Sequence, residues 1–179
     1  GNHDAYTPSS CYKKYGMPLN VHIFKGEPEL IETENYDVYG CGFTASHTNK
    51  SLLENFRVKN PTKKSVMIMH GEIKADSFYN PVSLKQIEES GLSYLALGHI
   101  HLPSDGISGN TCYAYCGTPQ PMSFKDGKKG YINIVTLDNR VKIEKTEISL
   151  HEFTSVNSDI TMCKTEEAIA DMAGNPEKA

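Results

Sequence analysis

The chain has 179 residues, 38% of them hydrophobic and 22% charged, which suits one domain with a buried core and argues against a disordered polypeptide. A net charge of -4 argues against a protein that binds nucleic acid by positive charge alone. No apolar run reaches membrane-spanning length, so we expect no membrane span. The five cysteines contain no CxxC pair, which favours free thiols in a reducing cytoplasm.

The first half of the chain predicts short strands, then a helix and a buried strand. Alternating apolar residues predict strands over 20–25, 29–33 and 36–43, with a turn at 26–28. Apolar residues at helical spacing predict a helix over 51–58, with Ser51 as its N-cap. The continuous apolar run over 65–69 is typical of a strand that is buried on both faces.

The second half predicts further strands between two helices. Residues 83–90 predict a short helix with Leu84 and Ile87 facing the core and Gly91 as its C-cap. Four more strands and a last helix are expected over 94–97, 112–116, 131–137, 141–148 and 165–172, in that order. Asp138-Asn139 predicts a hairpin between the last two strands. Strands mixed with a few helices predict a layered α/β fold.

Histidines directly follow the two predicted buried strands. His70 follows the first, and His99 and His101 follow the second. Loops at the carboxyl ends of strands commonly carry the sites of α/β folds. A glycine next to each group, at 71 and at 98, permits a sharp turn, so we expect the imidazoles of His99 and His101 to approach one point.

Together with Asn2, His3 and Asp4, these histidines form a set of nitrogen and oxygen donors. Such donors suit manganese, iron or zinc, and the absence of cysteine from the set argues against a structural zinc site. The alternative is that a histidine at a strand end is a hydrogen-bonded structural residue. We assign three other histidines to that class: His22, His47 and His151.

Three motifs occur in order along the chain: Gly1-Asn2-His3-Asp4, His70-Gly71 and Gly98-His99-Ile100-His101. They resemble the last three motifs of the calcineurin-like metallophosphoesterases. The segments 20–24, 84–101 and 115–130 are similar to those of the SbcD-type DNA repair exonuclease family. The resemblance implies an α/β layered sandwich of two mixed β-sheets flanked by helices, of which this chain holds the C-terminal part. It assigns residues 1–150 to the nuclease domain, and residues 151–179 to an exit segment and the truncated start of a capping domain.

The resemblance also implies roles for single residues. Two divalent metal ions are expected, with manganese the expected metal. Asn2, His70 and His99 would bind the second ion and His101 the first. His3 would lie near the scissile phosphate, and Asp4 would orient His3.

Two earlier family motifs, Asp-x-His and Gly-Asp-x-x-Asp, are not found in the sequence. They would supply the carboxylate that bridges both ions. The chain also opens without an initiator Met, so we expect it to be a piece of a longer protein. By itself it should bind metal weakly and be inactive, and its unpaired strand edges should favour homodimers or aggregates.

The implied activity is hydrolysis of DNA phosphodiester bonds, as an exonuclease or endonuclease in DNA repair, by water activated at two metal ions. The implied partners are DNA and an SMC-type ATPase subunit similar to SbcC, in the cytoplasm. Lys128 and Lys129 are the best candidates for contacts to the DNA backbone, the alternative being a solvated face. Two other functions stay open: a phosphomonoesterase or small-molecule phosphodiesterase of the same superfamily, and a non-catalytic scaffold with the same fold.

Overall fold

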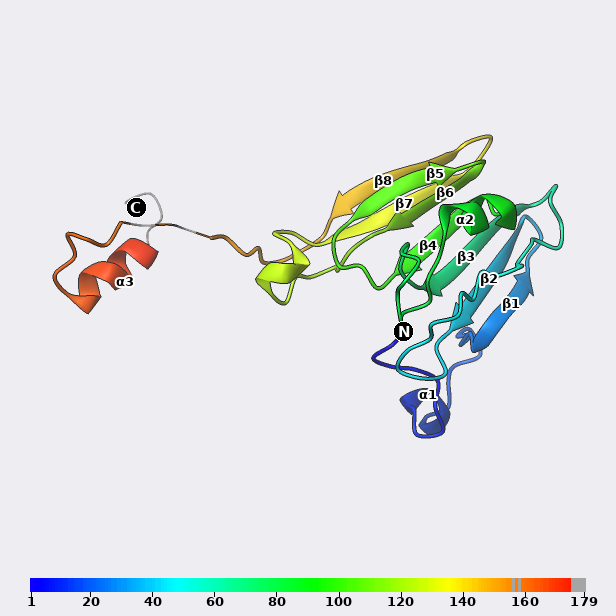
Figure 1. Cartoon of the computed structure of the whole chain (residues 1–179), viewed down its shortest axis with the longest axis horizontal. Coiled ribbons are helices and arrows are strands. Elements are labelled where there is room, and N and C mark those ends of the chain that lie inside the picture. Colours follow the sequence, from blue (N-terminus) through cyan, green and yellow to red (C-terminus); the bar gives the residue numbers. More distant parts are fainter. Residues whose placement is uncertain (156, 158, 175–179) are drawn as a thin grey trace.

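The computed structural model describes residues 1–155, 157 and 159–174. The chain forms an α/β fold with one six-stranded mixed sheet and a second, two-stranded antiparallel sheet (Figure 1). The strands are β1 (Gly26–Glu32), β2 (Tyr36–Gly42), β3 (Lys64–His70), β4 (Tyr94–Gly98), β5 (Ser104–Ser108), β6 (Thr111–Tyr115), β7 (Tyr131–Leu137) and β8 (Val141–Glu147). The helices are α1 (Cys11–Lys14), α2 (Leu84–Ser90), the 3-10 helix η1 (Phe124–Asp126) and α3 (Glu166–Gly174). None of the described helices combines the length and apolar character that a bilayer crossing requires.

The strand order of the large sheet is β1-β2-β3-β4-β6-β5. Its four central strands, β2, β3, β4 and β6, run parallel, and β1 and β5 are antiparallel edge strands. The carboxyl ends of the four parallel strands therefore meet at one edge of the sheet, where His70 pairs in register with Gly98. This edge is where parallel sheets place their sites, as expected from the sequence.

The core lies on one face of this sheet, beneath α2 and the loops that flank it. Its buried side chains are Tyr39, Cys41, Leu53, Met67, Met69, Val82, Ile87, Leu92, Leu95, Leu97 and Tyr115. The predicted helix over 83–90 is confirmed: Ser83 forms a capping box with Gln86, and Gly91 ends the helix with φ of 73°. Ile87 is fully buried as predicted, but Leu84 in the first turn is 47% exposed, so its predicted core position is wrong.

Two predicted elements of the first half do not form. Residues 20–25 are not a strand, and β1 starts at Gly26, inside the predicted turn. In this segment the Phe24 ring packs against Gly40 of β2, where a Cβ on residue 40 would lie 2.2 Å from the ring. Residues 51–58 form only turns, since Asn55 has φ of 59° and the Leu52 amide binds a side chain from another loop.

Strand β3 confirms the predicted position but not the predicted burial. Ser65, Met67 and Met69 are buried, whereas Ile68, on the opposite face, is 51% exposed. Within the described part of the chain that face is only partly covered, so the prediction of burial on both faces is wrong. Strand β5 was not predicted, because its polar sequence carries no strand pattern and it is held by pairing with β6.

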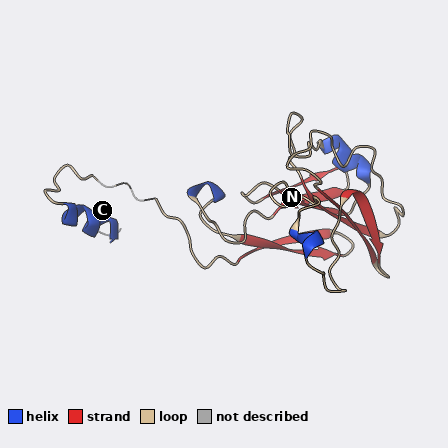
Figure 2. Ribbon diagram, turned by 90° about the horizontal axis from the view of Figure 1, so that it is seen from below, coloured by secondary structure: helices blue, strands red, loops and turns tan. Residues whose placement is uncertain are grey.

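The C-terminal elements follow the prediction. Strands β7 and β8 form the expected hairpin, and α3 lies close to its predicted bounds. In Figures 1 and 2, α3 lies apart from both sheets at the end of an extended segment.

Candidate metal-binding site

Three predicted ligands meet at the carboxyl edge of the parallel strands. The amide Oδ1 of Asn2 lies 2.8 Å from Nε2 of His70. Nδ1 of His99 lies 3.2 Å from the same His70 nitrogen, and the two imidazole rings are 5.0 Å apart. One oxygen and two nitrogen donors from distant parts of the sequence thus surround one small volume.

The loop after β3 is held rigidly, which fixes His70. The buried Asn80 amide donates to the His70 carbonyl over 2.8 Å, and the Tyr115 hydroxyl donates to the Gly71 carbonyl over 2.9 Å. Space is tight at position 98, because a Cβ there would lie 3.0 Å from Nδ1 of His70. The position of the His70 ring is therefore fixed by hydrogen bonds from buried side chains to the backbone carbonyls of His70 and Gly71.

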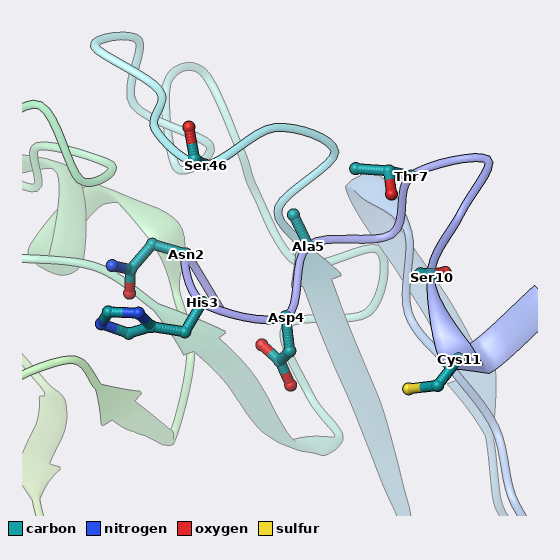
Figure 3. Close-up of a pocket in the computed structure, with 8 residues that line it drawn as sticks. All are labelled: Asn2, His3, Asp4, Ala5, Thr7, Ser10, Cys11 and Ser46. Atoms are coloured by element: carbon teal, nitrogen blue, oxygen red, sulfur yellow. The ribbon is translucent and has the colours of Figure 1, made fainter.

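The N-terminal loop brings Asn2 to this edge. The Tyr6 amide donates to the Phe43 carbonyl over 2.7 Å, immediately after β2, and this anchors the loop beside the strand ends. In Figure 3 the side chains of Asn2 and His3 extend to the same side of the loop, whereas the Asp4 carboxylate points away from them. The loop also borders a cavity of about 380 Å³, lined by Asn2, His3, Asp4, Ala5, Thr7, Ser10, Cys11 and Ser46.

Asp4 has partners other than the predicted one. Its two carboxylate oxygens accept hydrogen bonds from the Gly1 amino group and the Tyr12 hydroxyl, each over 2.6 Å. These two bonds lower the pKa of Asp4, and no hydrogen bond joins Asp4 to His3 in the described structure. His3 is thus present at the cavity without the carboxylate contact that the sequence suggested.

His99 and His101 have different side-chain partners. The left-handed backbone lies at His99, with φ of 98°, and not at Gly98. This conformation, unusual for a residue with a side chain, sets the His99 ring 4.7 Å from the Tyr79 ring. Two residues on, Nδ1 of His101 lies 2.5 Å from Oδ1 of Asp126.

The two paired imidazoles are electrostatically suited to hold a cation. Burial lowers the pKa of His70 to about 4, with smaller contributions from the Gly1 amino group and from His99. Burial also lowers the pKa of His99. Both rings are therefore neutral at physiological pH, and a neutral imidazole is the form that binds metal.

The donor atoms are of the types that bind divalent cations, but there are too few of them for a complete coordination shell. An amide oxygen and two imidazole nitrogens suit manganese, iron or zinc. No cluster of three or more His, Cys, Asp and Glu side chains with metal-binding geometry occurs among the described residues. The donors that meet here therefore form only part of a coordination shell.

Comparison with known proteins agrees with a metal site of this kind. YhaO of Bacillus subtilis (strain 168), described as an uncharacterized metallophosphoesterase, is 26% identical over 188 residues, covering 96% of this chain and 44% of YhaO. The SbcD component of the nuclease SbcCD from Escherichia coli (strain K12) is 46% identical over 55 residues, which is 30% of this chain and 13% of SbcD. The homology supports a place in the metallophosphoesterase superfamily.

The similarity covers only part of each relative. The chain spans less than half the length of these curated relatives. No protein-family model matches it.

The two predicted DNA-contacting lysines differ in their surroundings. Lys129 already forms ion pairs, at 2.9 Å with Glu147 and at 3.8 Å with Glu152. Lys128 is exposed beside it. Lys128 is therefore the more accessible of the two ammonium groups.

Sequence reasoning missed four residues that build the site: Tyr79, Asn80, Tyr115 and Asp126. Tyr79 and Asn80 lie in a loop without a strand or helix pattern, and Tyr115 reads as an ordinary strand residue. Asp126 lies in the segment noted for its resemblance to the exonuclease family, but no motif marks it. Asn80, Tyr79 and Asp126 are revealed by their contacts with His70, His99 and His101, and Tyr115 by its hydrogen bond to the Gly71 carbonyl.

Proposed function

We propose that this chain is part of a metal-dependent phosphodiesterase that cleaves DNA as an exonuclease or endonuclease. The observation that carries the proposal is the meeting of three donors at the carboxyl edge of the parallel strands. Nε2 of His70 lies 2.8 Å from Oδ1 of Asn2 and 3.2 Å from Nδ1 of His99. The similarity to SbcD of the nuclease SbcCD supports DNA as the substrate class.

The residues present would hold two divalent ions, with manganese expected. Asn2, His70 and His99 hold one ion and His101 contributes to the other. When bound, such ions supply an activated water and a clamp on the phosphate. The chain itself supplies neutral imidazoles at fixed positions, and the buried Asn80 keeps His70 in place.

His3 is the candidate for moving the proton at the leaving oxygen. It borders the cavity next to Asn2 and so lies close to where a phosphate would be held. A histidine in such a place can donate a proton to the departing alkoxide. Asp4, bound by Tyr12, would act on His3 through the field of its charge and not through a direct hydrogen bond.

The rest of the proposal concerns partners and domains. Lys128 is the proposed backbone contact for DNA, and an SMC-type ATPase similar to SbcC is the proposed partner. Residues 151–179 are proposed as an exit segment that leads into a capping domain, which is supported by the position of α3 away from both sheets.

The decisive experiment uses the full-length gene product with manganese. End-labelled linear duplex DNA, closed circular DNA, bis-nitrophenyl phosphate and nitrophenyl phosphate are offered as substrates. Cleavage of DNA that is lost in His70→Ala and kept in the exposed-histidine control His22→Ala supports the proposal.

The other outcomes separate the rival functions. Hydrolysis of nitrophenyl phosphate alone would show a phosphomonoesterase, and hydrolysis of the small diester without DNA cleavage would show a small-molecule phosphodiesterase. Metal binding without any hydrolysis would favour a scaffold.

A further inference from the structure

One carboxylate outside the predicted site contacts a predicted ligand. Asp126 lies in η1, and its side chain is only 9% exposed. Its Oδ1 lies 2.5 Å from Nδ1 of His101, although 25 residues separate the two. Its Oδ2 accepts hydrogen bonds from the Met122 amide and the Ser123 hydroxyl, each over 3.0 Å.

These contacts leave Asp126 as an acceptor only. Its Oδ2 faces two donors, the Met122 amide and the Ser123 hydroxyl, and its Oδ1 faces only the imidazole. A carboxylate that accepts in this way leaves Nδ1 of His101 as the donor, so the hydrogen between the two groups belongs to Nδ1. In the neutral ring Nε2 is then the atom with the free lone pair.

We propose that Asp126 is a positioning residue that holds His101 in the Nδ1–H tautomer and presents Nε2 as the metal-binding atom. The proposal rests on the proposed function for the metal and on the structure alone for the tautomer. The His101 side chain is 59% exposed, so its outer edge is open for a ligand. A carboxylate behind a ligating histidine fixes the ring and raises its basicity.

The loop that carries Asp126 is braced by the segment after β8. The Phe124 and Phe153 rings lie 4.9 Å apart. The Gln120 side chain accepts from the Leu150 amide over 2.8 Å and donates to the His151 carbonyl over 3.1 Å. Residues 150–153 thus stabilise the position of Asp126 without touching His101.

The first test reads the tautomer directly. In the ¹⁵N-histidine-labelled full-length gene product, free of metal and at pH 8, long-range ¹H–¹⁵N correlation should show His101 in the Nδ1–H form, assigned by the peak lost in His101→Gln. Asp126→Ala should shift His101 to the Nε2–H form that free histidine prefers. Ser123→Ala, which removes a loop hydrogen bond but no contact with His101, should leave the tautomer unchanged.

The second test reads metal affinity in the full-length gene product. Asp126→Ala should weaken manganese binding about 10- to 100-fold, the usual cost of losing such a partner. In a His101→Ala background the same change should have no further effect, because Asp126 acts through His101. A tautomer unaffected by Asp126→Ala, or the same loss in both backgrounds, would overturn the proposal.

The two tests also separate this inference from the proposed function. A tautomer shift in a protein that cleaves no DNA would support the role of Asp126 and contradict only the nuclease proposal. An active nuclease in which Asp126→Ala leaves the His101 tautomer unchanged would support the nuclease proposal and contradict the role of Asp126.

Discussion

Nε2 of His70 lies 2.8 Å from Oδ1 of Asn2, across 68 residues of sequence. Strand β3 delivers the histidine, and the loop bound to the end of β2 delivers the asparagine. The contact exists only because the two strands are parallel neighbours whose carboxyl ends coincide. The sheet topology, and not the local sequence, therefore brings these two donors together.

Manganese binding to the isolated chain should be weak, because the donors form only part of a coordination shell. His70→Ala and His99→Ala should each weaken it further, whereas His101→Ala should matter less, since His101 is proposed to contribute to the other ion. Calorimetry with manganese measures this, with His22→Ala as the control. Two tight sites in the isolated chain would contradict the partial-shell interpretation.

In the full-length gene product, substitutions of His3 and His70 should differ in their effect on metal content. His3→Ala should leave the metal content nearly unchanged but lower turnover ~10²–10⁴-fold, as for loss of a general acid. His70→Ala should lose both metal and activity. Asp4→Asn should fall between wild type and His3→Ala, because it removes charge without removing the imidazole. Metal analysis by plasma mass spectrometry and nuclease rates test this; equal metal loss in His3→Ala and His70→Ala would refute the role of His3.

Gly98→Ala should displace the His70 ring, since the new Cβ would lie 3.0 Å from its Nδ1. We expect changed His70 resonances and weaker manganese binding while the fold is kept. Gly16→Ala is the matched control, because no atom lies within 4 Å of the position where its Cβ would stand. An unchanged His70 spectrum in Gly98→Ala would show that the ring does not need this space.

Asn80→Ala should destabilise the fold, because it leaves the His70 carbonyl and the Leu52 amide without their partner. We expect a loss of about 2–4 kcal/mol in the free energy of unfolding, measured by urea denaturation. Asn80 also has a left-handed backbone, with φ of 55°, so part of the loss is backbone strain. Exposed Asn55, with φ of 59°, is the control for that strain. Asn55→Ala should cost only the backbone strain, about 1 kcal/mol; equal losses would mean that the Asn80 hydrogen bonds add nothing.

Association of the isolated chain is expected at micromolar concentration. Strands β1 and β5 are the edges of the large sheet, and Ile68 in a central strand is 51% exposed. Ile68→Lys should reduce association measured by light scattering, whereas Leu19→Lys in an exposed loop should not. A monodisperse wild-type monomer would contradict this expectation.

The sequence by itself determined the elements whose signals are local. The amphipathic spacing over 83–90 and the C-cap at Gly91 predicted α2, and apolar runs predicted β3 and β4. The histidines at the ends of those strands pointed to the sheet edge at which Asn2, His70 and His99 lie together. These predictions hold because caps and apolar periodicity act within a few residues of sequence.

The tertiary structure decided everything that depends on distant neighbours. Residues 20–25 do not pair as a strand although their pattern predicts one, and pairing with β6 creates β5 from a polar segment. The fold also gives His101 a partner, Asp126, in a loop that is packed against residues 150–153. Side-chain partners across loops leave no periodic signal in the sequence, so only the folded chain shows which imidazoles share a site.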